Sequence, residues 1–320
     1  MTRRSLMPAL ILCLVLGTAA GAPPLPEPLS LEQALALADS HPRTQASPSV
    51  AARLPRRHPL YLDCHALAFG VVDPARGRPP APLIEPVPAQ RLEIMERFFD
   101  VLLADLAYSS ASEAMAVAYV QLDRARARGE LGQTSPLRVS ELDAVYEDIL
   151  QERTVGELGQ QWTRALLAQA LDRPETLPRD LVTPMLPPQP EAPPPLDTLA
   201  AAAVGEPAIG ARLSAGDTAA DQQLERLELR QQLAEVRLRL LALAAAGRKL
   251  RSEAAYRDLK LDESRTLYEQ EVSADLGYAM SRQTMTRMQE ARVAYCRALA
   301  WAELNALTGR PVWPAAGSTP

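Results

Sequence analysis

The residues best suited to chemistry lie close together in the segment 58-HPLYLDCH-65, and they are His58, Asp63, Cys64 and His65. Imidazole, carboxylate and thiol groups bind zinc and copper in proteins. Their spacing here matches no standard metal motif, however. We therefore prefer to interpret them as polar residues of a loop and of a strand face, and we keep metal binding as the weakest of three functional hypotheses.

A second group with chemical potential is formed by three methionines, Met280, Met285 and Met288. Thioethers can hold Cu(I). The spacing of these residues is typical of a helix, so packing in a core or seam is the preferred interpretation. We expect no metal site and no cofactor.

The sequence lacks the common catalytic motifs: a Gly-rich phosphate loop, a Gly-x-Ser-x-Gly elbow and a His-Glu-x-x-His run. An enzyme would have to take its acid or base from the many carboxylates of the predicted helices. Such carboxylates are more simply explained as solvated helix faces. We expect that the protein is not an enzyme and has no catalytic residues.

The N-terminus predicts export. Arg3 and Arg4 form a basic region, residues 10–16 form a short apolar core, and small residues follow up to Ala22. This pattern is typical of a signal peptide, here residues 1–20, with cleavage after Ala20. No later stretch of about 18 apolar residues is evident, so we expect no membrane-spanning helix.

Composition and charge exclude some classes of protein. The net charge of −5 argues against nucleic-acid binding through a basic surface. Aromatic residues make up only 4% of the chain, and Leu and Ala dominate its apolar fraction. This composition is typical of long helices rather than of a β-sandwich. We therefore expect a mainly α protein with little or no β structure.

Two cysteines remain after the predicted signal peptide, Cys64 and Cys296. They could form a disulfide after export. A single bridge across so long a loop has little support without a framework of other cysteines. Two buried thiols are the preferred interpretation.

The first predicted element is a short helix in 29-LSLEQALALADSHP-42. Ser30 and Gln33 form a capping box, and Pro42 follows the expected end. The proline-rich chain from Thr44 to Pro88 predicts loop, except that apolar residues alternate in 60-LYLDCHALAFGVVD-73. This alternation predicts one strand.

A long helical hairpin follows. Helix signals run for about 40 residues from Ala89 to Arg128, which corresponds to roughly 60 Å. The segment 128-RGELGQTSPLRVSEL-142 then reverses the chain, because its glycines end one helix while Ser135 and Pro136 begin the next. The second helix is expected to reach about Leu171.

The rest of the chain predicts a linker and a second hairpin. Residues 174–195 are proline-rich. A helix from about Asp217 to Glu271 breaks at 272-VSAD-275, and Asp275 begins the last helix, which ends at Thr308. We therefore divide the chain into segments 1–20, 23–173, 174–195, 196–311 and 312–320. The segments 23–173 and 196–311 are interpreted as two repeats, with hairpin tips near 129–136 and 271–275.

Two apolar stripes follow the helix after Asp217. One comprises Leu229, Leu233, Val236, Leu240, Leu243, Leu250, Ala254 and Leu261. The other comprises Leu224, Leu227, Ala234, Leu238, Leu241 and Ala245. The stripes lie on nearly opposite sides of the helix, so a neighbour is expected on each flank. Side-by-side closure into a ring, or a plain antiparallel coiled coil, would satisfy this pattern.

The chain resembles a known family in four segments: 29-LSLEQALALADSHP-42, 91-RLEIMERFFDVLLA-104, 130-ELGQTSPLRV-139 and 297-RALAWAELNALTGRP-311. These resemble, in the same order, four stretches of the TolC-like outer-membrane efflux proteins, among them the opening helix, the first hairpin tip and the final Leu-Thr-Gly helix. The second tip departs from the pattern, because Glu271 stands where that family has glycine.

The resemblance implies an α-barrel of long hairpins from three protomers, a β-barrel in the outer membrane and a continuous tunnel. It also implies a periplasmic tip where a membrane-fusion adaptor docks, itself joined to an inner-membrane pump. The adaptor-docking residues would be Gly132, Thr134, Ser135, Val272 and Ser273. Turn and cap chemistry explains the same residue types.

The membrane part departs from the family. Residues 60–73 offer one strand, and 205–217 are too short for a strand pair. We therefore expect a reduced member whose barrel strands are shortened or lost. The leading hypothesis is an efflux component, in the outer membrane or periplasm, that exports small molecules or ions. The alternatives are a barrel-less periplasmic scaffold that contacts an adaptor or a full-length paralogue, and a periplasmic metal-binding protein.

Overall fold

A computed structural model describes residues 25–47, 50, 54, 56–72, 83–174, 179–270 and 276–314. The predicted signal peptide lies outside these residues, as do Val272 and Ser273. The fold is mainly α, as expected. Within the described part of the chain, the only β pairing is an isolated parallel bridge between Leu29 and Leu181.

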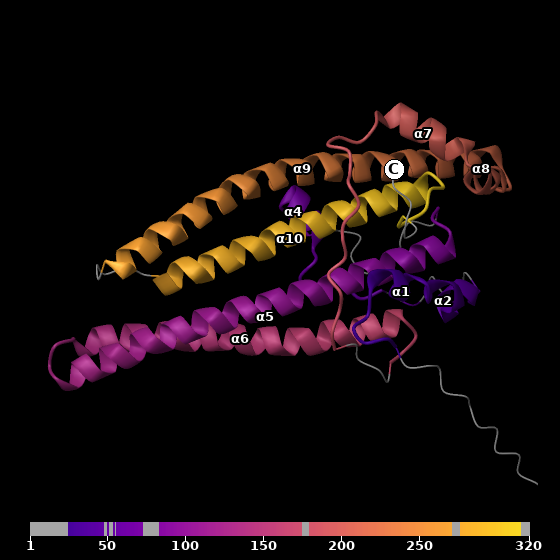
Figure 1. Ribbon diagram of the computed structural model, residues 1–320. Helices are drawn as coiled ribbons and strands as arrows, with labels where there is room; N and C mark the ends of the chain where they lie inside the picture. The colour runs from indigo at the N-terminus through magenta and orange to yellow at the C-terminus, as the bar shows by residue number, and fades with distance from the viewer. Residues whose placement is uncertain are drawn as a thin grey trace, which may run out of the picture.

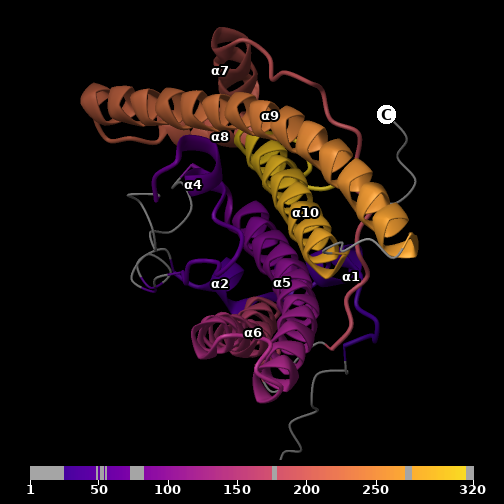
Figure 2. The same cartoon turned by 90° about the vertical axis from the view of Figure 1, so that its left-hand side faces the viewer.

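Two long antiparallel hairpins form the body of the molecule. The first consists of α5 (Pro86–Glu130) and α6 (Pro136–Ala170), and the second of α9 (Ala219–Glu269) and α10 (Leu276–Leu307). The four helices lie side by side in the order α6, α5, α10, α9, which places the two hairpins in one layer (Figures 1 and 2). Both predicted hairpins are therefore present, and α6 and α9 form the edges of the layer.

Local caps explain where these helices begin. The Ser135 hydroxyl accepts a hydrogen bond from the Arg138 N–H at 3.2 Å, as the sequence predicted. The helix α9 begins at Ala219 rather than at Asp217, because Thr218 and Asp221 cap each other through bonds of 3.0 and 3.1 Å.

The N-terminal helix is shorter than expected. Ser30 and Gln33 do form the capping box, with bonds of 2.9 and 3.3 Å. The helix α1 (Leu31–Leu35) nevertheless ends early and is followed by a 3₁₀ turn, η1 (Ala38–Ser40), and by α2 (Pro42–Gln45). Pro42 therefore begins a helix instead of following one, a position that suits its fixed φ.

The strand predicted for residues 60–73 is wrong. Residues Cys64–Phe69 form the helix α4, which Asp63 caps by accepting the Ala66 N–H at 3.0 Å and which Gly70 ends at a φ of +74°. Alternating apolar residues suggested a strand, but Cys64, Leu67 and Ala68 also have helical spacing and share one partly buried face. Over so short a segment the two periods cannot be separated from sequence.

Two helices before α9 were not predicted. They are α7 (Leu196–Gly205) and α8 (Pro207–Ser214), and α8 occupies the segment that was considered as a short strand. Both pack against α9 at the end of the layer farthest from the hairpin tips (Figure 1). Pro207 stands in the first turn of α8, where its missing N–H costs nothing.

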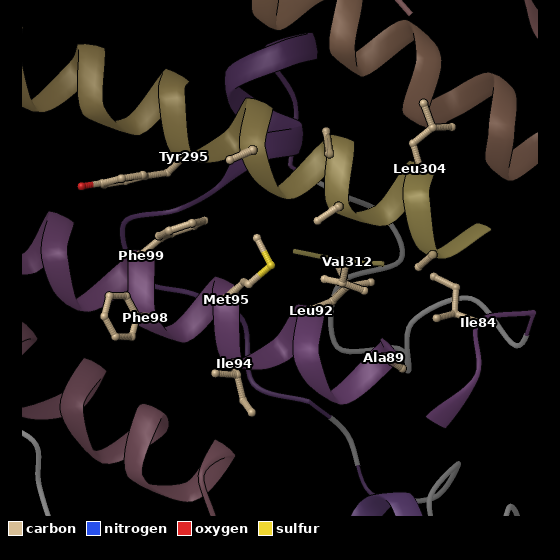
Figure 3. Close-up of a cluster of buried hydrophobic side chains, with 14 of the residues drawn as sticks. Ile84, Ala89, Leu92, Ile94, Met95, Phe98, Phe99, Tyr295, Leu304 and Val312 are labelled. Atoms are coloured by element: carbon tan, nitrogen blue, oxygen red, sulfur yellow. The ribbon is translucent and has the colours of Figure 1, made fainter. Parts of the chain in front are cut away.

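The core lies between α5 and α10 at this same end of the layer. Met95 and Phe99 of α5 face α10, and Figure 3 shows Phe99 against Tyr295. Their rings stack with centroids 4.6 Å apart and planes 7° from parallel. Leu304 and Val312 extend the same apolar contact toward the chain end. This packing joins the two hairpins, which have no short connection in sequence.

The helix α5 requires a correction to the expectation that no helix could span a membrane. By length and composition alone, α5 is long and apolar enough to do so. The same composition suits a helix that packs on both sides within a protein, and α5 lies between α6 and α10.

The linker crosses one face of the layer from α6 to α7 (Figure 1). It pairs with the N-terminal segment, since Leu29 donates to the Asp180 carbonyl and accepts from the Val182 N–H, both at 2.9 Å. Farther along, the Arg237 side chain donates to the Pro194 carbonyl at 3.0 Å. In Figure 2 the linker and α4 lie on opposite faces of the layer.

Candidate interaction surfaces

The first hairpin tip has the predicted turn geometry. Gly132 adopts a φ of +69°, and its N–H bonds to the Gly129 carbonyl at 2.9 Å. Gly132 and Ser135 are exposed and Thr134 is half-buried. The turn chemistry predicted for Gly132 and Ser135 is therefore confirmed, and docking at this tip stays a prediction.

Two leucines make this tip more apolar than its turn requires. Leu131 is 72% exposed and Leu137 is 80% exposed, and they flank the turn. Leu131 was not singled out as a candidate site residue. The sequence could have indicated it, because turns are usually formed by Gly, Pro, Asn, Asp and Ser, and a leucine in one is unusual.

The described helices of the two hairpins end at different levels. The last helix begins beside Val117 of α5, where a side chain on Gly277 would collide with Val117. The remainder of α5, up to Glu130, adds about 20 Å of helix beyond this point. Figure 1 accordingly shows the first hairpin extending past the second. The second predicted docking pair, Val272 and Ser273, lies outside the described residues.

The two stripes of α9 have different environments. Leu229, Leu233, Val236, Leu240 and Leu243 of the first stripe are buried within the chain. In the second stripe Leu224, Leu227 and Leu238 are 67%, 55% and 52% exposed. We call these three residues the α9 edge. One of the two predicted flanks is therefore covered within the described chain, and the α9 edge is exposed.

The opposite edge of the layer carries a similar stripe. Val155, Leu158 and Trp162 of α6 follow one another at spacings of three and four residues and are each at least half exposed. We call them the α6 edge. On the adjacent face of α6, Gly156 and Gly159 are buried against α5 and the segment before α4, since side chains there would meet Tyr108 and Tyr61. The α6 edge therefore lies beside this buried face, about 100° round the helix from it, and its three side chains are exposed within the described chain.

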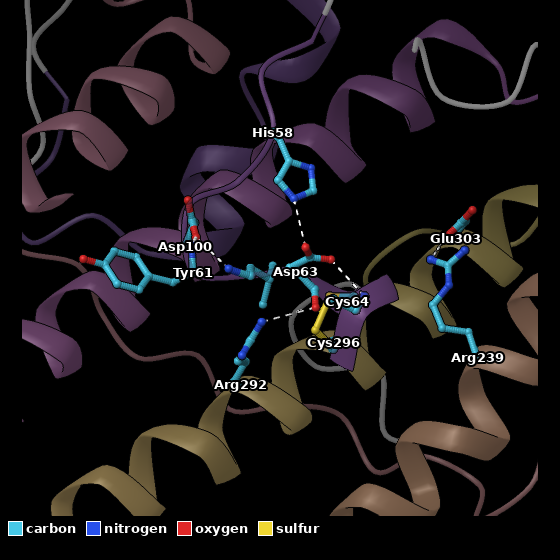
Figure 4. Close-up of a disulfide and its surroundings, with 11 residues drawn as sticks. His58, Tyr61, Asp63, Cys64, Asp100, Arg239, Arg292, Cys296 and Glu303 are labelled. Atoms are coloured by element: carbon cyan, nitrogen blue, oxygen red, sulfur yellow. Dashed lines mark hydrogen bonds and ion pairs between the residues drawn. A yellow bond between two sulfur atoms is a disulfide. The ribbon is translucent and has the colours of Figure 1, made fainter. Parts of the chain in front are cut away.

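The interpretation of the cysteines as two buried thiols is wrong. Cys64 of α4 and Cys296 of α10 form a disulfide with a Cα–Cα distance of 5.3 Å (Figure 4). The two residues are 232 positions apart in sequence. Only the packing of α4 against the second hairpin brings them together, so no local signal could have revealed the pair.

A buried carboxylate holds the segment before α4. Asp100 of α5 is completely buried and accepts the N–H groups of Leu60, Tyr61 and Leu62 at 2.7, 2.7 and 2.9 Å. Burial raises the pKa of Asp100, although the three N–H groups act to lower it. One turn earlier, burial raises the pKa of Glu96 to about 7, against the opposing effect of Arg97.

The candidate metal ligands are engaged in other interactions. His58 lies 3.4 Å from Asp63, Cys64 is in the disulfide, and a His65 ring nitrogen lies 2.8 Å from the Val71 carbonyl oxygen. Among the described residues, no group of three or more His, Cys, Asp or Glu side chains could hold a metal ion. Met288 is buried, whereas Met280 and Met285 are exposed.

Comparisons with known proteins give different answers for sequence and for structure. No protein-family model matches this chain. No curated protein matches it in sequence either.

Among solved structures, the chain is similar to the outer membrane protein VceC of Vibrio cholerae, with 14% identity, coverage of 71% of each chain and a TM-score of 0.46. It is also similar to a membrane protein from Pseudomonas aeruginosa, with 16% identity, coverage of 70% of each chain and a TM-score of 0.37.

The likeness to CusC is more extensive. It covers 89% of this chain and 93% of that one, at 13% identity and a TM-score of 0.53. The CusC structures are described in terms of folding and transmembrane channel formation. At this level of identity the likeness concerns the fold alone. The chain has a TolC-like, mainly helical fold.

Proposed function

We propose that this protein is a TolC-like efflux component, exported to the outer membrane or periplasm, whose hairpins assemble into a helical tunnel for small molecules or ions. It would carry out no catalysis of its own. In this proposal copies of the chain stand side by side, as a homotrimer or together with a full-length paralogue.

The observation that supports assembly most directly is the pair of exposed apolar edges. The α6 edge and the α9 edge lie on the two outermost helices of one layer, and each presents large exposed side chains at coiled-coil spacing. A layer with an apolar stripe on both edges is stabilised when the edge of one copy meets the opposite edge of the next. Repetition of that contact closes a ring.

The proposed docking end is the hairpin tip. We propose that Gly132, Thr134 and Ser135, with Val272 and Ser273, contact the hairpins of a membrane-fusion adaptor that leads to an inner-membrane pump. The exposure of the first tip supports this assignment, and Leu131 and Leu137 would supply its apolar contact area.

A mixing experiment tests the proposed assembly. Sedimentation velocity of the detergent-solubilised chain should show oligomers for the wild type and monomers for both Trp162→Glu and Leu238→Glu. Each substitution places a charge in every interface of a ring. An equal mixture of the two variants retains one intact interface between unlike chains, so it should yield dimers that do not grow.

The matched control is Gln161→Glu, which adds the same charge to an exposed position on α6 beside the α6 edge. It should assemble like the wild type. A wild-type chain that stays monomeric at high concentration contradicts the proposal. Assembly of Trp162→Glu alone would show that α9 pairs with α9, which excludes closure through unlike edges.

The alternative is a periplasmic helical scaffold without a channel. The observation in its favour is α4, because the segment expected to supply a strand is instead a helix bonded to α10. Fractionation separates the two proposals. A channel should require detergent for extraction from the outer membrane, whereas a scaffold should be released by salt.

A further inference from the structure

Residues 56–69 join the two hairpins across one face of the layer, and we call this segment the clasp. It begins against α5 of the first hairpin and ends as α4 against α9 and α10 of the second (Figures 2 and 4). The two ends of the clasp are attached by different chemistry.

The end of the clasp on the first hairpin is held by several buried hydrogen bonds. Asp100 accepts three consecutive backbone N–H groups, those of Leu60, Tyr61 and Leu62. The buried Arg97 donates to the Arg57 carbonyl. Bonds to a buried charge are among the stronger hydrogen bonds in proteins, and they persist whatever the state of the cysteines.

The end on the second hairpin has fewer hydrogen bonds, and the face of α4 that packs there, Cys64, Leu67 and Ala68, is only partly buried. None of the side chains of α4 is fully buried. Besides the disulfide, Arg292 contacts the Asp63 carbonyl at 3.4 Å, which is a long hydrogen bond. A six-residue helix with this little burial has a small tendency to stay in place by itself. The disulfide is therefore the main attachment of α4.

We propose that the clasp is a redox-sensitive latch, in which the Cys64–Cys296 disulfide keeps α4 on the second hairpin while Asp100 holds the other end permanently. A dithiol reductant would open it. One of its thiolates attacks Sγ of Cys64, which is half-buried, and Cys296, which is 0% exposed, leaves as a thiolate that takes up a proton.

The second thiol of the reductant then displaces Cys64 from the mixed disulfide. The reductant becomes a disulfide, and the protein gains two electrons and two protons as two thiols. After this step α4 is no longer tied to α10. The segment that joins the hairpins then ends at Leu62, and the second hairpin is held by packing, by the linker and by side-chain bonds such as that of Thr284 to Glu113.

Hydrogen exchange of the full chain, read by mass spectrometry, tests the latch. The reporters are the N–H groups of Leu67 and Gly70, which bond within α4 at 3.0 and 2.8 Å, and those of Leu60 to Leu62, which bond to Asp100. On addition of dithiothreitol, exchange in α4 should become at least about tenfold faster. Exchange at residues 60–62 should change less than about twofold.

Two variants make the result specific. Cys64→Ser should behave like the reduced wild type and should not respond to dithiothreitol. Asp100→Asn with the disulfide intact should show the reverse pattern, with faster exchange at 60–62 and little change in α4. Because the wild-type arm starts from folded protein, the test does not depend on the folding of either variant.

Unchanged exchange of α4 on reduction would overturn the latch, because packing would then hold the helix. Equal acceleration at both ends would overturn it as well, because the two attachments would not be independent. Neither outcome depends on assembly or transport, so the latch and the proposed function stand or fall separately.

Discussion

The two halves of the helical layer differ in how they are held together. In the base half, where α1, α7 and α8 pack, nearly every residue of α5 from Ala89 to Ala104 is buried. In the tip half, from 105 to 130, only Ser110, Ala118, Leu122 and Ala125 of α5 are buried. The helix α5 is therefore part of the core in its first half and is mostly exposed or half-buried in its second half.

The difference arises from what covers the faces of the layer. At the base, the clasp covers one face and the linker the other, so α5 is surrounded (Figure 2). Toward the tip, each helix packs mainly on its neighbours within the layer, as far as the described residues go. Stability is thus concentrated at the base, while the tip half is left free to contact other molecules. Paired substitutions along the same helices measure this contrast.

The largest difference is expected between two aromatic residues of α5. Phe99→Ala removes a fully buried ring that stacks on Tyr295 and should lower the free energy of unfolding by about 3–5 kcal/mol. Tyr119→Ala, at a position 53% exposed in the tip half, should cost less than about 1 kcal/mol. Urea unfolding followed by circular dichroism measures both. Equal losses would show that the tip is as tightly packed as the base.

Two carboxylates of α5 provide the second comparison. Asp100→Asn places an amide NH₂ where a buried oxygen accepts backbone N–H groups, and it should cost about 3 kcal/mol. Glu113→Gln alters the bond of 2.7 Å that the exposed Glu113 accepts from the Thr284 hydroxyl in the tip half, and it should cost less than about 0.5 kcal/mol. The same urea unfolding assay measures both losses. A larger loss for Glu113→Gln than for Asp100→Asn would contradict the conclusion that stability is concentrated in the base half.

The third effect is a dependence of stability on pH, which arises from Glu96 in the base half of the layer. Burial raises the pKa of Glu96 to about 7 from 4.5, so the folded state binds more protons than the unfolded state between these values. Stability should therefore fall as pH rises through this range. The loss should be about 2 kcal/mol after allowance for the 29% exposure of the side chain.

Glu96→Gln should remove this loss, so the variant should exceed the wild type in stability at pH 8 and approach it near pH 4.5. Unfolding curves across this range are the measurement. Glu147→Gln on α6 is the control, because it also removes one negative charge, but from an exposed position rather than a buried one. A wild-type profile that rises with pH between 4.5 and 7 would contradict the assignment.

The smallest effect is expected at two glycines of the second hairpin. Gly277→Ala places a methyl group 2.5 Å from a Val117 carbon, and the β-branched Val117 cannot easily turn away, so it should cost about 1 kcal/mol. In Gly247→Ala the new methyl group meets nothing closer than 3.6 Å, and stability should rise by about 0.5 kcal/mol. The melting temperature should therefore fall for Gly277→Ala and rise for Gly247→Ala, relative to the wild type.

Most of the helical framework could be predicted from local signals. The turn at Gly132, the cap at Ser135 and the end of the last helix were readable because each depends on a few adjacent residues. The helix α4 was missed because its six residues satisfy both a strand and a helix pattern. The anchoring role of Asp100 was missed because its partners lie some 40 positions away.

The sequence by itself determined two long hairpins, the turn at the first tip and two apolar stripes on α9, since helix caps and the 3.6-residue period act within a few residues. Only the tertiary structure decided which stripe is covered, how far the first hairpin extends beyond the start of α10, and that Cys64 meets Cys296. These features depend on packing between distant segments, whose free energy is shared among many side chains and has no local signature.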